Sequence, residues 1–145
     1  CGLHTRLSDC PLWFSEGIAI YFETPDLNSS KGWSTVGAVS RSRLDQFRSY
    51  SSRRPADSLV TLLSDDKRLR NTKDGLDAYA EAWALTYFLM HQHPKQYVAY
   101  LGMLAAKKPM FWDDPQTRLR EFKQVFGDDL EKLDAEFTRY ILRLR

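Results

Sequence analysis

One carboxylate stands in the most apolar stretch of the chain. Residues 11–23 read PLWFSEGIAIYFE, and Glu16 is the first charged side chain of this run. Moving an ionised carboxylate out of water is costly unless it is hydrogen-bonded, protonated, paired with a cation or bound to a metal ion. Two interpretations of Glu16 therefore stay open. It is either a metal ligand, or a carboxylate that caps a neighbouring helix or pairs with an arginine.

The motif around Glu16 resembles the second zinc-binding helix of the gluzincin metallopeptidases. It reads Trp13-x-x-Glu16-Gly17-x-Ala19-x-Tyr21-Phe22-Glu23. In that family this glutamate and two histidines of an H-E-x-x-H helix bind one zinc ion, so the resemblance implies that Glu16 is the third ligand. Catalytic zinc sites typically take three protein ligands and keep a position for water. Gly17 fits the motif, because a residue without Cβ lets another backbone approach closely.

The chain contains no H-E-x-x-H motif. Its histidines are His4, His91 and His93, and no two of them are four residues apart. In the gluzincins the histidine helix lies shortly before the glutamate. In this protein, the corresponding position of that helix is upstream of Cys1. We therefore expect a fragment of a larger metallopeptidase-like protein, with the histidines and the general base in the missing N-terminal part. The alternative is a family member that has lost this helix.

A second motif, from Tyr79 to Leu89, resembles a helix that follows the zinc glutamate in the aminopeptidase branch of the gluzincins. The resemblance assigns Tyr79 the catalytic role of donating a hydrogen bond to the tetrahedral intermediate. A phenol placed where negative charge develops stabilises the transition state more than the ground state. Without the resemblance, a tyrosine on a buried helix is a core residue whose hydroxyl is satisfied locally. Both interpretations of Tyr79 stay open.

Two further glutamates lie near these motifs. Glu23 follows Glu16 by seven residues, two turns along the same helical face. It either accepts a hydrogen bond from a zinc-bound histidine and so orients that ligand, or is exposed at the end of its helix. Glu81 is two positions beyond Tyr79 and therefore points elsewhere, which disfavours a catalytic role shared with Tyr79.

The composition fits a single domain over residues 1–145. With 43% hydrophobic and 13% aromatic residues, a chain of 145 residues can form a self-sufficient core. The formal net charge of +2 requires no polyelectrolyte partner. We interpret Arg41, Arg43, Arg48, Arg53 and Arg54 as a solvated basic face rather than a nucleic-acid site. No apolar run is long enough to predict a membrane-spanning segment. Cys1 and Cys10 leave the redox compartment, and with it the localisation, open.

Helical spacing of apolar residues dominates the chain, and no strand pattern is convincing. We expect helices over residues 11–23, 39–50, 58–63, 76–91, 96–107 and 117–126, and from 128 or 129 to the end. Asp57 is expected to cap the third of these, a charged loop to follow it through Lys73, Pro94 to stop the fourth, and Gly127 to cap the sixth. The aromatic loop from Met110 to Pro115 is expected to cover a core edge.

These observations predict an all-α, multi-helix bundle resembling the C-terminal helical half of a gluzincin peptidase. The ending from Phe126 onward also resembles bacterial gluzincin-like domains of unknown function. The implied function is zinc-dependent hydrolysis of a peptide or protein substrate by the intact protein, a hydrolase activity that residues 1–145 alone should lack, with no zinc bound by the fragment. The alternative is a non-catalytic helical module that uses the peptidase-like scaffold to bind another protein.

Overall fold

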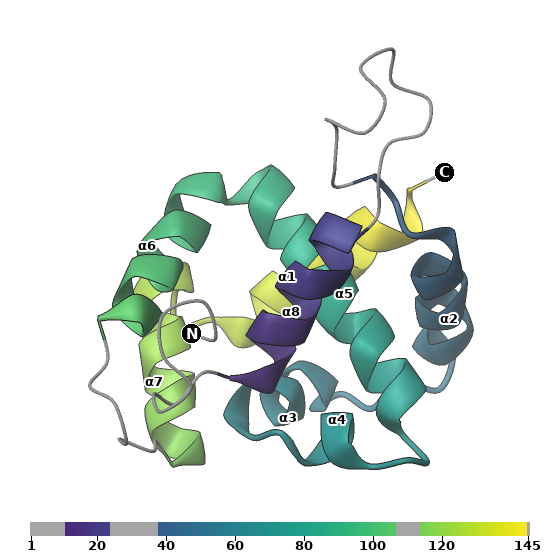
Figure 1. Ribbon diagram of the computed structural model, residues 1–145, viewed down its shortest axis with the longest axis horizontal. Coiled ribbons are helices and arrows are strands. Elements are labelled where there is room, and N and C mark those ends of the chain that lie inside the picture. The colour runs from purple at the N-terminus through teal and green to yellow at the C-terminus, as the bar shows by residue number, and fades with distance from the viewer. Residues whose placement is uncertain (1–10, 24–37, 107–113, 145) are drawn as a thin grey trace.

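The computed structural model describes residues 11–23, 38–106 and 114–144, and all regular structure in these ranges is helical (Figure 1). The predicted all-α fold is therefore confirmed. The eight helices of the described ranges are α1 (Leu12–Glu23), α2 (Arg41–Ser51), α3 (Ser58–Ser64), α4 (Lys67–Arg70), α5 (Gly75–Gln92), α6 (Pro94–Ala105), α7 (Pro115–Phe126) and α8 (Leu130–Leu142).

Helix α5 is the centre of the molecule. It packs against α1, α2, α4, α6 and α8, and its residues from Ala80 to Leu89 are all buried. Apolar side chains on every face of a helix are typical of one surrounded by protein, as the sequence between Tyr79 and Met90 predicted. In Figure 1, α1 lies in front of α5 and α8, while α6 and α7 stand on the opposite side of the molecule from α2.

The close contact between α1 and α5 depends on Gly17. A Cβ atom at this position would lie 2.1 Å from Oγ1 of Thr86 and 2.8 Å from the carbonyl oxygen of Ala82. Both distances are below any real van der Waals contact, so only glycine lets the two helices approach this closely. The expectation that Gly17 permits close backbone approach is confirmed.

Aromatic side chains anchor the start of α1 to α6 and α7. The ring of Trp13 stacks on Tyr100 at a centroid distance of 6.0 Å and meets Phe14 and Phe122 edge-on. Trp13 has no solvent exposure. Such pairs add to the free energy gained from burial itself, so the helix that carries Glu16 is held firmly at its first turn.

One expectation about helix boundaries was wrong, and the expected stop at Pro94 is confirmed, since α5 ends at Gln92. The segment after α3 is not a charged loop throughout, because Lys67–Arg70 forms the short helix α4. It forms because Leu69 inserts into the core and the carboxylate of Asp65 accepts from the backbone N–H of Lys67. Pro94 does more than stop α5. It is the first residue of α6, a position where proline costs no hydrogen bond, so His93 alone separates the two helices.

The predicted helix caps are confirmed in part. Asp57 occupies the position before α3, but its side chain makes no capping hydrogen bond. Side-chain caps are made instead by Asp114, which accepts from the N–H of Thr117, and by Asp129, which accepts from the N–H of Lys132. Gly127 ends α7 with φ of 102°, as predicted for a glycine cap.

Some expectations fall outside the described residues, namely those on Cys1, His4 and Cys10 and on the aromatic loop up to Asp113. Among the described helices, none is long and apolar enough to cross a membrane.

Candidate functional site

Glu16 lies beside the α1–α5 crossing, one residue before Gly17. Its side chain is half-buried. Within the described ranges, no ion pair or side-chain hydrogen bond reaches its carboxylate. The interpretation of Glu16 as the partner of an arginine therefore has no observed contact behind it. A half-buried carboxylate without a partner among the described residues is able to serve as a metal ligand.

Tyr79 is half-buried near the start of α5. Ala82, one helical turn further along the same face, is the residue whose carbonyl oxygen lies at Gly17. Glu16 and Tyr79 thus belong to the two helices of one crossing, with Glu16 next to Gly17 and Tyr79 one helical turn before Ala82. Within the part of the chain that is described, no hydrogen bond joins their side chains. The ring of Tyr79 instead lies under the guanidinium of Arg43, 5.8 Å from centroid to Cζ.

Glu23 is the last residue of α1 and its side chain is exposed. No ion pair or hydrogen bond with another described residue fixes it. Its role as an acceptor for a ligand histidine stays a prediction, because no contact among the described residues tests it.

The fully buried carboxylate of the described residues is Glu81, with no exposed side-chain area. It accepts hydrogen bonds from Nε of Arg54 at 2.8 Å, from Nη1 of Arg68 at 2.9 Å and from Oγ of Ser58 at 2.7 Å. Two cations and a hydroxyl thus compensate its charge inside the fold, as a buried carboxylate requires.

Arg54 extends this cluster to α8. Its two terminal nitrogens donate to the carboxylate oxygens of Asp134 at 3.0 and 2.6 Å, a bidentate contact. The side chain of Arg54 is only 7% exposed, so its assignment to a solvated basic face was wrong. Burial opposes the charge, but hydrogen bonds to Asp134 and Glu81 raise the pKa of Arg54 above its usual value, and it stays a cation. We call Ser58, Arg54, Arg68, Glu81 and Asp134 the buried ionic cluster.

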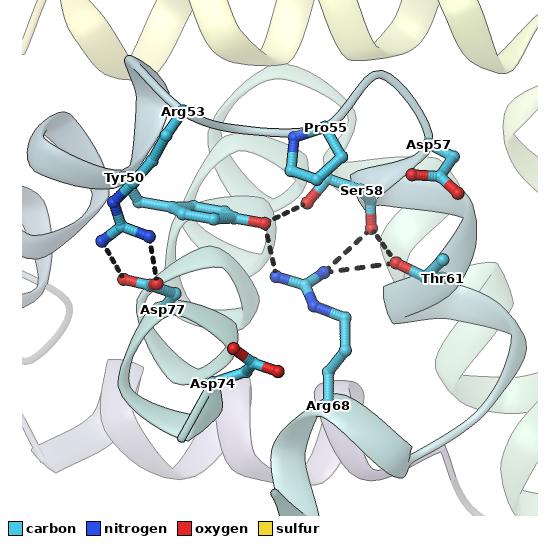
Figure 2. A pocket seen from close by; sticks show the side chains of 9 residues that line it. All are labelled: Tyr50, Arg53, Pro55, Asp57, Ser58, Thr61, Arg68, Asp74 and Asp77. Atoms are coloured by element: carbon cyan, nitrogen blue, oxygen red, sulfur yellow. Dashed lines mark hydrogen bonds and ion pairs between the residues drawn. The ribbon is translucent and has the colours of Figure 1, made fainter. Parts of the chain in front are cut away.

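A polar pocket of about 360 Å³ opens beside the buried ionic cluster (Figure 2). Arg68 crosses its floor and donates to the hydroxyls of Tyr50 and Thr61, while Tyr50 also contacts the hydroxyl of Ser58. The pocket is lined by Tyr50, Arg53, Pro55, Asp57, Ser58, Thr61, Arg68, Asp74 and Asp77. Since its arginines already have acidic partners, the pocket offers a ligand few unsatisfied donors.

One acid that lines this pocket, Asp77, has a shifted pKa. Asp77 accepts from Arg53 at 2.7 Å and from Nε2 of Gln46 at 2.7 Å. Burial by itself raises the pKa of Asp77, but these hydrogen bonds outweigh it and hold the pKa below the usual value. Asp77 is therefore an ionised structural partner of Arg53.

A complete metal site is not formed by the described residues. No group of three or more histidine, cysteine, aspartate or glutamate side chains in these ranges could hold a metal ion. Glu16 provides one carboxylate of the kind that zinc accepts. The remaining ligands of such a site would have to come from outside residues 11–23, 38–106 and 114–144.

A family model described as "Protein of unknown function (DUF1570)" matches residues 1–111. This chain belongs to the DUF1570 family. The matched range of this DUF1570 protein contains Glu16, Glu23 and Tyr79, and ends before α7 and α8. No curated protein and no solved structure matches the chain.

Sequence reasoning missed the buried ionic cluster of this DUF1570 protein. The signal was present, because Glu81 stands between Ala80 and Ala82 in a helix that is apolar on every face. The same argument that selected Glu16 applies to Glu81 with more force. Its partners, however, come from α3, α4 and the segment after α2, and no spacing in the sequence pairs them with it.

Proposed function

We propose that this chain supplies the third zinc ligand of a gluzincin-type peptidase, with Glu16 as that ligand. The observation that carries the proposal is the half-buried carboxylate of Glu16, which has no partner among the described residues although it stands in the motif of the zinc glutamate. The two histidines and the general base would come from a segment encoded before Cys1. When bound, zinc would activate a water molecule for attack on the peptide carbonyl.

The residues of this chain have separate tasks in the proposed reaction. Glu16 would hold the metal through a carboxylate oxygen, and the anchored start of α1 would keep that oxygen in place. Tyr79 would donate its hydroxyl proton in a hydrogen bond to the carbonyl oxygen as negative charge develops there. Glu23, exposed at the end of α1, would accept from the outer nitrogen of a zinc-bound histidine.

The test uses the longer protein that includes the residues encoded upstream of Cys1. We expect an H-E-x-x-H motif there, one zinc ion per molecule, and zinc-dependent cleavage of a casein-type protein substrate. Glu16→Gln should abolish stoichiometric zinc binding. The control variant is Glu136→Gln, at a half-buried glutamate on α8, and it should bind zinc as the wild type does. An upstream region without two histidines one turn apart contradicts the proposal.

A calorimetric titration of residues 1–145 provides a second check. We expect zinc to bind this piece no more tightly than it binds the Glu16→Ala variant, since three ligands are needed for a tight site. One stoichiometric site that depends on Glu16 would show that the ligand set lies inside these residues, against the proposed division of the site.

The second candidate function is a non-catalytic module that binds another protein through α1. Phe22 is 53% exposed, and Ile18 and Ala19, on the same side of this helix, are only half-buried. An apolar outer face of this kind is typical of contact with another segment. A longer protein that binds no zinc and cleaves no peptide, yet loses a protein partner on Phe22→Ser, would favour this module.

A further inference from the structure

Arg43 differs from Arg48, Arg53 and Arg54, three other arginines of its segment. Arg53 and Arg54 pair with acids, and Arg48 donates to the carbonyl oxygen of Leu144. Arg43 is half-buried, yet within the described residues it has no ion pair or hydrogen-bonded acceptor. Among the described residues, its guanidinium lies over the ring of Tyr79, whose centroid is 5.8 Å from Cζ.

The position of Arg43 is unfavourable for the stability of α2. It lies in the first turn of this helix, where the helix dipole disfavours a cation, and that turn contains no acidic residue. The contact with the Tyr79 ring is a stabilisation of similar size to this cost. A guanidinium over an aromatic ring still presents several N–H donors at its edge, in the planar arrangement that matches a carboxylate. Since no acceptor among the described residues takes these donors, the edge of the Arg43 guanidinium is a candidate site for a planar anion.

We propose that Arg43 binds a carboxylate of the peptide substrate beside Tyr79. This inference rests on the proposed function, in which the hydroxyl of Tyr79 reaches the carbonyl that is attacked. Because Arg43 touches Tyr79, the bound carboxylate belongs within a residue or two of the cleaved bond. It is either the C-terminal carboxylate of a short peptide or the side chain of an aspartate or glutamate. Arg43 is then a specificity residue of the site.

The experiment measures peptide binding to the protein by NMR, with the side-chain Nε–Hε signal of Arg43 as the readout. The three probes are N-acetyl-trialanine with a free carboxylate, its C-terminal amide, and the N-acetylated tripeptide amide with glutamate in the middle. We expect the first or the third probe to shift the Arg43 signal, and the neutral amide to leave it in place. The probe that binds identifies the source of the carboxylate.

Variants locate the site. Arg43→Gln should weaken binding of the responding probe at least about tenfold, the loss typical of a hydrogen bond between charged groups. Arg43→Lys should recover part of the affinity, because it restores the charge without the bidentate geometry. The matched control is Arg41→Gln, an exposed arginine in the same turn, which should bind the probe as the wild type does.

The inference is overturned if no probe shifts the Arg43 signal at millimolar concentration, if acid and amide bind equally, or if Arg43→Gln binds normally. Failure of the proposed function has a different signature. If the proposed function is right, the zinc content of the longer protein should fall in a Glu16 variant and stay unchanged in an Arg43 variant. A protein without zinc that keeps Arg43-dependent carboxylate binding would refute the peptidase and leave a binding site for acidic peptides.

Discussion

At the scale of single residues, Glu16 and Glu81 are two carboxylates with opposite environments. Glu81 is enclosed and accepts from Arg54, Arg68 and Ser58, so the fold itself uses its charge. Glu16 is half-buried and makes no such contact with a described residue. Stability should therefore depend on Glu81 more than on Glu16.

We expect Glu81→Gln to lower the free energy of unfolding by about 3–5 kcal/mol, the cost of leaving buried cations without their counter-charge. Glu16→Gln should change the free energy of unfolding by no more than about 0.5 kcal/mol, as for positions without such partners. Urea denaturation of both variants measures the difference. A loss at Glu16 as large as that at Glu81 would mean that Glu16 has a structural partner.

Asp77 should make the free energy of unfolding depend on pH in the acidic range. Its pKa is lowered in the folded state because Arg53 and Gln46 donate to the carboxylate. Its contribution to stability is therefore fully present above the unfolded pKa of about 3.9 and is lost as the pH falls through the lower folded value. We expect the difference in unfolding free energy between wild type and Asp77→Asn to be constant near neutral pH and to shrink below pH 4. A difference independent of pH contradicts this assignment.

At the scale of elements, the crossing of α1 and α5 decides where Glu16 lies. The crossing needs Gly17, because a Cβ atom there would overlap Thr86 and the carbonyl oxygen of Ala82. The backbone oxygen cannot rotate away as a side chain can. A larger residue at this position must therefore push the two helices apart.

We expect Gly17→Ala to destabilise the protein by about 1–3 kcal/mol, the usual cost of overpacking a core. The matched control is Gly102→Ala on α6, where a Cβ atom would meet nothing within 4 Å. That change should stabilise the protein by roughly 0.5–1 kcal/mol, because alanine favours a helix over glycine. Thermal unfolding of the two variants should therefore shift in opposite directions. A shift in the same direction would show that Gly17 is not in close contact.

Most of the helices could be predicted because apolar residues recur at helical spacing. Leu44 and Phe47 mark α2, and Tyr97, Tyr100 and Leu104 mark α6; all five are buried. The short helix α4 gave no such signal, since Leu69 is its single buried residue among basic neighbours. Local pattern cannot show that one leucine will find a place in the core, because this depends on the helices already packed around it.

The sequence predicted the residues of the candidate site that lie within one motif, but not the contacts between helices. Glu16 and Gly17 are adjacent in sequence, and the lack of a side chain at Gly17 permits the close helix packing that the structure shows. The contact between Arg43 and Tyr79 joins two helices, and nothing in their spacing indicates it. Long polar side chains reach in many directions, so their partners are fixed by the tertiary structure.

At the scale of the whole molecule, a few polar contacts tie distant segments together. Arg54 joins Glu81 on α5 to Asp134 on α8. Asp66 accepts from the backbone N–H of Leu12 at 3.0 Å and from Arg118 at 2.7 Å, which joins the start of α1 to α7. Because these contacts connect both ends of the described chain to its centre, the helices should not unfold independently.

We therefore expect residues 1–145 to unfold as one cooperative unit. Asp66→Ala should lower the denaturation midpoint of helix content and of tryptophan fluorescence by the same amount, because it removes a partner of both α1 and α7. The measurement is best made with Trp33 and Trp112 replaced by phenylalanine, so that the buried Trp13 and Trp83 report. If fluorescence changed well before helix content, α1 would be detaching separately, and the carboxylate of Glu16 would belong to a mobile helix rather than to a fixed site.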